Sequence, residues 1–397
     1  MIVNDVAARI QQFNEDRDPE RRQRKFARMR ENPFAFFRGS AHLFYEDWPD
    51  RSPLDDAPPT WISGDLHLEN FGSYRGDNGL AYFDLNDFDE AVLAPPTWEV
   101  ARFLTSVFVA ADMLKLPRAD AVLLGKAFLA AYTAALIDGK ARWIERDCAT
   151  GMVRRLLRSV EDRSHRAMLK ERTTGTGLEC RLRNLENRIL PATPADRRMV
   201  VELVGQFAEH RPDPRYYKVL DVARRVAGLG SLGVARYAVL VRGHDIKNGQ
   251  RLLDLKHESP SVLVPRLRIP QPAWASEAVR VATIQHRAQA VPPGHLYAVG
   301  HNFRLRELQP MEDRLALAHW NGKVRRLRNV MTAMGELTAW SQLRCAGRDG
   351  AAGTDDLIAF GRAQDWQIEI IRCARQYRET VVRDWRAFVA AGDKSVT

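Results

Sequence analysis

Cysteine is scarce in this sequence, which has four cysteines in 397 residues, at positions 148, 180, 345 and 373. The four are widely spread and form no Cys-x-x-Cys pair, so neither a disulfide framework nor a zinc finger is indicated. Free thiols in a reducing cytoplasm are the simplest interpretation, and we expect a cytoplasmic protein.

Long apolar runs are also missing. The most apolar stretch, residues 121–137, contains Lys126 and Tyr132. It falls short of the roughly 20 apolar residues that a membrane-spanning helix needs. The first residues show no basic region followed by an apolar one, as a secretion signal would. We therefore expect a buried helix at 121–137 and no association with a membrane.

The charge has a basic excess without a clear nucleic-acid pattern. Lys and Arg number 60 against 50 Asp and Glu, which gives a formal net charge of +10. The basic residues concentrate in 142–198, where acidic residues are interleaved, as on solvated helix faces. Attraction of an anionic substrate or of nucleic acid is the alternative. Because no basic stretch is interleaved with aromatic residues, the pattern argues against nucleic acid.

The composition is that of a globular protein, with 45% hydrophobic and 28% charged residues, and at this length two lobes are expected. Along the chain the pattern is helical, then mixed with strands, then helical again. The predicted units are a helical and loop segment at 1–60, a unit at 61–210, a sheet with one helix at 215–310, and helices at 320–395. Strands are predicted at 217–222, 235–242, 251–256, 296–299 and 303–308, and helices at 273–290, 324–345 and 355–391.

A cluster of carboxylates in an apolar frame points to chemistry. In Gly64-Asp-Leu-His-Leu-Glu-Asn70, an Asp and an Asn five residues apart on one loop can serve one ligand. Asp65 can take a proton from a hydroxyl, and the oxygen of Asn70 can bind a metal. The segment 82–91 adds four carboxylates among aromatic residues. Buried carboxylates need a neutralising cation, and oxygen ligands suit Mg²⁺ with bound phosphates. An acidic surface turn is the alternative, which the aromatic neighbours disfavour.

Gly64-Asp-Leu-His-x-x-Asn70 resembles the catalytic loop of aminoglycoside phosphotransferases and related small-molecule kinases. Asp87-Phe-x-x-Ala91 resembles the metal-binding motif that follows it in those enzymes. The resemblance implies that Asp65 is the catalytic base, Asn70 a metal ligand and Asp87 the main Mg²⁺ ligand. We add Asp89 to the predicted metal ligands.

Three further positions bear on this resemblance. The segment Glu99-Val-Ala-Arg102 stands where those kinases have Asp-Leu-Ala. The sequence departs from their pattern at Ser63, where they have a His. Asp84 is a rival to Asp87 as the metal ligand, which the spacing disfavours.

The segment Gly228-Leu-Gly-Ser-Leu-Gly233 has the spacing of a glycine-rich phosphate loop. A dinucleotide-binding fold would need a helix after the glycines. Strand-like residues follow instead at 235–242, so a β-hairpin is predicted. The residues expected to bind the phosphates of a nucleotide are Gly228, Gly230, Ser231 and Gly233.

A lysine follows on the next predicted strand. Lys256 can reach the α- and β-phosphates as a point charge, with an ordinary strand-end lysine as the alternative. Glu277 is the only acidic residue of the predicted helix at 273–290, and we expect it to hold this lysine as part of the nucleotide site. Glu258 is a rival that we consider too close in sequence to turn back.

The order of these parts is inverted relative to an ordinary kinase, because the catalytic loop precedes the glycine loop and the lysine. The predicted helix at 324–345 looks like the one that normally precedes the catalytic loop. Joining Cys345 to Trp61 would restore the usual order, which indicates a circular permutation. We therefore predict an α+β, bilobal protein-kinase-like fold, circularly permuted, with a small antiparallel-sheet nucleotide lobe inserted between helical segments of the C-lobe.

The whole chain is similar to a bacterial family known as domain of unknown function 2252. The matching pieces are Asn32–Gly39, Gly64–Gly72, Asp84–Ala91, Gly228–Gly233 and Arg306–Pro310. The family has kinase-like motifs, and the resemblance implies no particular substrate. Arg38, in the first piece, is a further predicted catalytic residue that either pairs with the acidic loop or faces a phosphate.

We therefore expect an ATP- and Mg²⁺-dependent phosphotransferase whose acceptor is a hydroxyl of a small molecule. Asp65 would deprotonate the acceptor, and Lys256 would bind the phosphates. Alternatives on the same fold are transfer of AMP with the nucleotide reversed, and a pseudokinase scaffold that binds a nucleotide or a protein partner.

Overall fold

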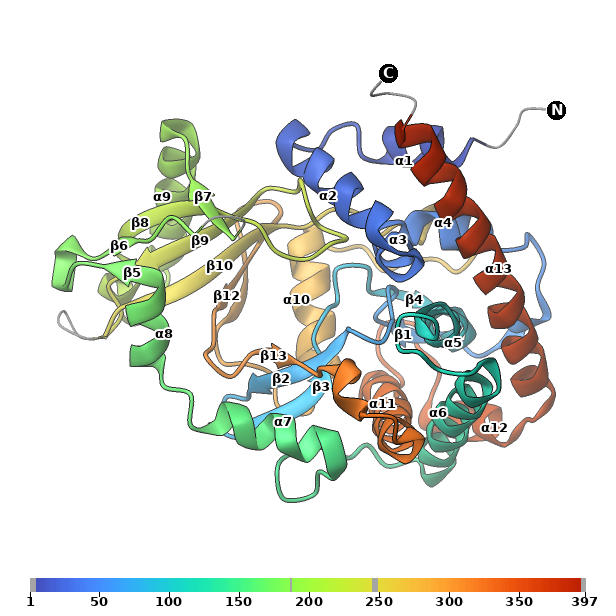
Figure 1. Cartoon of the computed structure of the whole chain (residues 1–397). Helices are drawn as coiled ribbons and strands as arrows, with labels where there is room; N and C mark the ends of the chain where they lie inside the picture. The colour runs from blue at the N-terminus through green and yellow to red at the C-terminus, as the bar shows by residue number, and fades with distance from the viewer. Residues whose placement is uncertain (1–4, 186–187, 245–248, 394–397) are drawn as a thin grey trace.

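The structure is a computed structural model that describes residues 5–185, 188–244 and 249–393. The predicted unit at 320–395 ends on two residues outside these ranges. The protein is a mixed α+β molecule whose strands pair antiparallel in small sheets. Figure 1 shows the main sheet on one side and a body of helices on the other. The predicted α+β class and the small antiparallel sheet are confirmed.

The helical body is built around α5 (Pro96–Ala110), in which every residue is buried. Helix α6 (Arg118–Asp138) packs along α11 (Val324–Cys345). A Cβ at Gly335 would lie 2.4 Å from the carbonyl oxygen of Phe128, so only glycine permits this close helix contact. The other helices of the body are α7 (Gly151–Glu161), α12 (Thr354–Arg362) and α13 (Asp365–Asp393). Helix α8 (His165–Arg172) lies beside the main sheet, where Met168 and Leu169 pack with Leu240 and Leu252 (Figure 1).

Helix α6 confirms the helix predicted at 121–137. It is the one helix in the described ranges that is long and apolar enough to cross a membrane. Half of its most apolar window is buried inside the protein, against neighbours such as α11. A core helix of a globular protein meets the same length and composition criterion.

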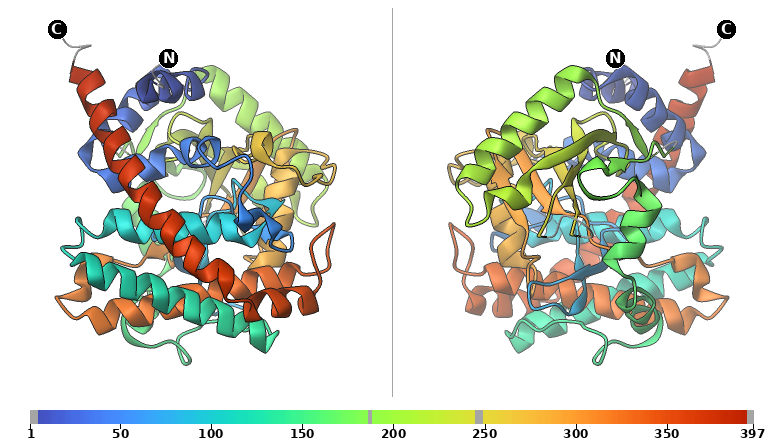
Figure 2. Two further views of the ribbon diagram at one scale, coloured as in Figure 1. Left: turned by 90° about the vertical axis from the view of Figure 1, so that its right-hand side faces the viewer. Right: turned by 90° about the vertical axis from the view of Figure 1, so that its left-hand side faces the viewer.

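The main sheet has six strands in the order β11-β12-β10-β9-β8-β7. Their bounds are Leu296–Val299 (β11), Phe303–Glu307 (β12), Arg251–His257 (β10), Arg236–Val241 (β9), Val219–Arg225 (β8) and Ile189–Pro191 (β7). Helix α9 (Pro194–Glu209) packs on the sheet over an apolar core that includes Val239 and Leu255. Helix α10 (Glu277–Ala288) links β11 and β12 to α11 (Figure 2).

Four short N-terminal helices and several small ladders complete the fold. The helices are α1 (Val6–Phe13), α2 (Pro19–Glu31), α3 (Pro33–Gly39) and α4 (Ala41–Glu46). The small strands are β1 (Thr60–Ile62), β2 (Phe71–Arg75), β3 (Ala81–Leu85), β4 (Val92–Ala94), β5 (Thr173–Thr174), β6 (Arg181–Leu182) and β13 (Asp313–Arg314). Strand β1 pairs with β4, β2 lies between β3 and β13, and β5 pairs with β6. These ladders hold the loops that carry Asp65 and Asp87.

The structure agrees with the predicted elements where the sequence pattern was strong. A hairpin follows the glycines, since β9 pairs with β8 and β10, and α11 has the predicted bounds. The single helix predicted at 355–391 is wrong, because the chain breaks at 363–364 and forms α12 and α13. Strand β7 and helix α9, assigned by prediction to the unit 61–210, pack on the main sheet.

Candidate active site

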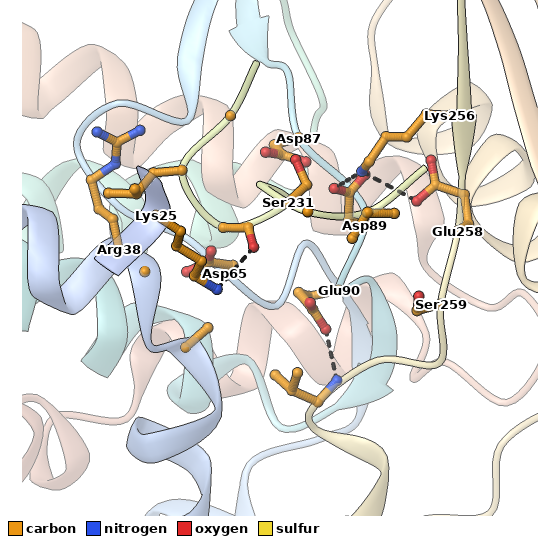
Figure 3. A pocket seen from close by; sticks show the side chains of 18 of the residues that line it. Lys25, Arg38, Asp65, Asp87, Asp89, Glu90, Ser231, Lys256, Glu258 and Ser259 are labelled. Carbon is orange, nitrogen blue, oxygen red and sulfur yellow. Dashed lines mark hydrogen bonds and ion pairs between the residues drawn. The ribbon is translucent and has the colours of Figure 1, made fainter. Parts of the chain in front are cut away.

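One cavity of about 510 Å³ lies where the main sheet, the N-terminal helices and the short ladders meet (Figure 3). Ten of the eleven residues predicted for the site line it. They are Arg38, Asp65, Asn70, Asp87, Asp89, Gly228, Gly230, Ser231, Gly233 and Lys256. The eleventh, Glu277, lies outside this lining.

The loop that carries Asp65 follows β1 and needs its glycine. Gly64 has a φ of +83°, and a Cβ there would lie 2.2 Å from the carbonyl oxygen of Glu90. Glycine therefore lets the loop approach the segment 86–91, here called the acidic loop. The side-chain amide of Asn70 donates to the carbonyl oxygen of Asp65. Its amide oxygen is the atom that remains suited to a metal.

Asp65 is paired with a buried arginine from α5. Arg102 is 0% exposed, and its Nε donates to Asp65 Oδ1 at 2.7 Å. The guanidinium also lies 4.2 Å from the ring centroid of Phe37 and donates to the Phe37 carbonyl. Burial raises the pKa of Asp65, and the charge of Arg102 opposes that rise. Arg102 thus holds the carboxylate of Asp65 through Oδ1, while the other oxygen, Oδ2, lies beside Gly230.

Glu99 anchors the start of the same loop. Its Oε2 accepts from the backbone N–H and the hydroxyl of Ser63, at 2.8 and 2.9 Å. Its Oε1 accepts from Gln342 on α11 at 2.6 Å. Burial raises the pKa of Glu99 to about 7. Ser63 is thereby tied to α5 through Glu99.

The acidic loop places Asp87 and Asp89 in the cavity on either side of the buried Phe88. Burial, and then the charge of Asp89, raises the pKa of Asp87. Burial acts the same way on Asp89, but Lys256 and Arg304 outweigh it and lower the pKa of Asp89. Asp89 contacts Lys256 Nζ and accepts from Arg304 Nη2 at 3.0 Å.

No group of three or more His, Cys, Asp or Glu side chains within the described ranges is arranged to hold a metal. The donors at this cavity nonetheless fit Mg²⁺, which proteins bind through one or two carboxylates together with substrate phosphates. Asp87 and the amide oxygen of Asn70 supply such donors. Asp89, predicted as a ligand, is in contact with Lys256 and Arg304.

The glutamate that pairs with Lys256 is Glu258. The prediction that Glu277 holds this lysine is therefore wrong. Lys256 Nζ lies 3.3 Å from Glu258 Oε2, and both side chains are buried. Residues two apart on a strand share one face, so their proximity in sequence brings them together. Glu277 opens α10 and pairs instead with Arg280 at 2.6 Å.

Arg38 lies beside the loop that carries Asp65. Its Nη1 is 2.8 Å from Glu69 Oε2, and its Nε contacts His67 Nε2 at 3.4 Å. The sequence predicted either an ion pair with the acidic segment at 82–91 or a contact with a phosphate, and the observed partner, Glu69, lies outside that segment. Arg314 pairs with the same carboxylate at 3.1 Å.

The glycine loop is held by cations that the sequence had not suggested. Gly228 and Gly233 have φ values of +75° and +94°. Arg17 donates to the carbonyls of Gly230 and Leu232 at 2.5 and 2.8 Å. Lys25, buried on α2, donates to the Gly230 carbonyl at 3.2 Å. Figure 3 places Lys25 next to Asp65.

Lys25 is an unusual residue for a buried position. Its other partner is the side-chain oxygen of Asn14, at 2.8 Å. Burial holds the pKa of Lys25 well below its usual range. A sequence signal for Lys25 does exist. Arg21, Lys25 and Met29 are spaced by four residues, so they share the buried face of α2. Arg21 likewise donates to the Val234 carbonyl at 3.0 Å.

One protein family covers this site and nearly the whole chain. Residues 17–391 match the model of a family described as "Uncharacterized protein conserved in bacteria (DUF2252)". The protein therefore belongs to this family, which confirms the resemblance inferred from its motifs. No curated protein and no solved structure is found to match the chain.

Proposed function

We propose that this member of the DUF2252 family is an ATP- and Mg²⁺-dependent phosphotransferase acting on a hydroxyl of a small molecule. The observation that carries the proposal is the single cavity that joins Asp65, Asp87 and Lys256 beneath the glycine loop. These residues come from distant parts of the chain, since Asp89 and its contact Lys256 are 167 positions apart. A base, metal ligands and a phosphate-binding lysine are the parts that phosphoryl transfer requires.

The proposal includes a bilobal, circularly permuted protein-kinase-like fold. Strand β8, the glycine loop, β9 and β10 with its lysine follow one another in the order of a kinase nucleotide lobe. In this proposal the units are the nucleotide lobe at 215–310, the C-lobe at 61–210 and 320–395, and the segment 1–60 packed on the C-lobe.

Support for the permutation comes from the segment after α11. The indole N–H of Trp61 donates to the carbonyl of Arg348 at 2.9 Å. The backbone N–H of Ala352 donates to the carbonyl of Pro59 at 2.7 Å. The segment that leaves α11 therefore runs beside the start of β1, where a chain in the usual kinase order would continue.

Asp65 is the group suited to receive the proton of the acceptor hydroxyl. Arg102 holds Oδ1, so Oδ2 is the oxygen turned to the cavity. Because Arg102 is buried under Phe37, the carboxylate keeps one orientation. The burial that raises the pKa of Asp65 makes it a better proton acceptor than an exposed aspartate.

Asp87 and Asn70 would hold the metal, and Lys256 would bind phosphate oxygens. Mg²⁺, when bound, would neutralise charge on the phosphates. Lys256 is kept in place by Asp89 and Glu258, so it enters the reaction already oriented. Gly230 and Ser231 of the glycine loop line the same cavity.

The experiment is a transfer assay with ATP, Mg²⁺ and fractionated bacterial metabolites, in which mass spectrometry identifies the modified acceptor. We expect a phosphoryl adduct with the unchanged protein and none with Asp87→Ala. Asp162→Ala, an exposed aspartate at the end of α7, is the matched control and should keep full turnover. Unchanged turnover in Asp87→Ala would refute the assignment, and an adenylyl adduct would favour AMP transfer. Absence of any ATP-dependent thermal stabilisation would favour a scaffold.

A further inference from the structure

A second cavity, also of about 510 Å³, continues from the active site beneath the main sheet. Asp87, Asp89 and Lys256 line both cavities. We call the second one the sheet cleft. Its lining is mostly charged or amide-bearing, and the described residues with larger apolar groups are few: Tyr74, Ala227 and Pro293. Tyr74 is 4% exposed, so its ring offers little surface to a ligand.

Three guanidinium groups in the sheet cleft share one buried carboxylate. Asp254 on β10 is 1% exposed and forms two hydrogen bonds with Arg236, at 2.8 and 2.5 Å. Arg225 and Arg306 lie 2.7 and 3.4 Å from the same Oδ2 atom. Arg306 has a second partner in Glu312 at 2.7 Å. The three guanidinium groups of this cluster are therefore paired with only two carboxylates, those of Asp254 and Glu312.

The strand register makes this cluster continuous with the active site. Asp254 and Lys256 lie two residues apart on one face of β10, a spacing of about 7 Å. Directly opposite on β12, Arg306 faces Asp254 and Arg304 faces Lys256. On β9, Arg236 faces Lys256. A strip of cations thus runs along the underside of the sheet from Lys256 to Arg225.

The side chain of Arg225 is the least satisfied of these groups. Its Nη1 is buried and close to Asp254, yet that contact lacks hydrogen-bond geometry. Burial lowers the pKa of Arg225 to about 10, with the charge of Asp254 opposing the effect. An anion with several oxygens would supply the acceptors that a third arginine cannot obtain from one carboxylate.

A purine ring is a poor occupant for such a surface. Its binding requires apolar contact over both faces, and here it would cover guanidinium groups without pairing them. Linked phosphate groups match the cleft better, because each phosphate offers several oxygens to the arginine fork.

We propose that the sheet cleft is a binding site for linked phosphate groups, held by Arg225, Arg236 and Arg306 beyond Lys256. The inference rests on the proposed function, since it names the part of the donor that lies under the sheet. The same chemistry is offered by the triphosphate of a nucleotide whose base lies outside the cleft and by an inorganic polyphosphate.

The test is isothermal titration with ATP, sodium tripolyphosphate and adenosine in the presence of Mg²⁺. We expect ATP and tripolyphosphate to bind and adenosine to give no measurable heat. Arg225→Gln should weaken tripolyphosphate by about tenfold, the effect of losing one charge-assisted pair. Arg224→Gln is the matched control on β8. Arg224 donates to the Pro191 carbonyl, pairs with Asp18 and is not part of the cleft lining. The Arg224→Gln variant should therefore bind tripolyphosphate as tightly as the unchanged protein does.

Binding of adenosine as tight as that of ATP would overturn the inference. So would unchanged tripolyphosphate binding in both Arg225→Gln and Arg306→Gln, each checked for an unaltered thermal midpoint. The transfer assay with Asp87→Ala tests the proposed function independently of this binding experiment. Tripolyphosphate as the sole donor, compared with ATP, distinguishes the two sources of phosphate through the mass of the product.

Discussion

Arg102 and Asp65 form an ion pair in which one partner is wholly inside the protein and the other opens onto the cavity. The guanidinium is 0% exposed and the carboxylate 19%. The arginine comes from α5, the helix buried along its entire length, whereas the aspartate sits on a loop. The position of the proposed base is therefore set by the core of the helical body.

Asp65→Asn is expected to abolish transfer and to lower the free energy of unfolding by about 3 kcal/mol, because it leaves the Arg102 charge buried without its carboxylate. The double variant Asp65→Asn with Arg102→Met should regain much of that stability without regaining transfer. Urea denaturation of both variants and of the single Arg102→Met completes a double-mutant cycle. Additive losses in the cycle would show that the pair has no energetic coupling.

Lys25→Met is expected to loosen the glycine loop. The substitution keeps the length of the side chain but removes the donor to the Gly230 carbonyl and to Asn14. Hydrogen exchange of the amides at 228–234 should become faster, by about tenfold, the effect of one lost hydrogen bond. Arg28→Met, on the exposed face of the same helix, is the control. Equal protection of the loop in the two variants would contradict a clamping role for Lys25.

The Glu99 carboxyl is expected to make stability depend on pH. Its pKa rises from 4.5 to about 7 on burial, so the folded protein binds this proton more tightly than the unfolded chain does. The resulting stabilisation is complete below about pH 4.5 and is lost as the pH rises to about 7, a change of about 3 kcal/mol. Glu90, whose pKa burial also raises to about 7, acts in the same direction.

Glu99→Gln should therefore reduce the loss of unfolding free energy that occurs as the pH rises from about 4.5 to about 7. The amide oxygen can still accept from Ser63, and Gln342 can turn its own amide to accept from the new NH₂ group. Urea midpoints measured at pH 5 and pH 8 give the comparison, with the exposed Glu202→Gln as the control. A decline as steep as that of the unchanged protein would show that Glu99 does not titrate in this window.

Glu258→Gln and Glu277→Gln separate the observed lysine partner from the one expected from the sequence. The first removes the charge that Lys256 and Arg304 share in a buried place, and should cost about 2 kcal/mol of stability. It should also weaken binding of Mg·ATP by about tenfold. Glu277 is 29% exposed and pairs with the buried Arg280, which also donates to the carbonyls of Ala91 and Asp89. Because Arg280 keeps these acceptors, the loss of Glu277 should cost about 1 kcal/mol of stability. A larger effect on ATP at Glu277 would restore the original expectation.

Local patterns were enough to predict ten of the residues that line the cavity. Asp65 and Asn70 share one loop, Asp87 follows on the next, and the glycines precede a strand, so short spacings carry this information. The error at Glu258 came from treating nearness in sequence as an obstacle, although alternation along a strand places residues 256 and 258 on one face.

The rest depended on contacts between distant segments. Arg17 reaches the carbonyl of Gly230 across 213 positions, and nothing in the local sequence of either residue indicates the other. Arg102 reads as an ordinary charged residue of a helix until α5 is seen to be buried. The arginines around Asp254 come from three strands, and their convergence follows from the strand register.

The long separations in this fold also have a meaning for synthesis on the ribosome. Trp61 finds its carbonyl partner 287 positions later, and Asp89 contacts a lysine 167 positions later. The proposed base and metal ligands therefore emerge early and wait for the sheet and for α11 before the cavity can close around them. During synthesis Asp89 therefore remains without its cationic partners Lys256 and Arg304 until the strands that carry them have emerged.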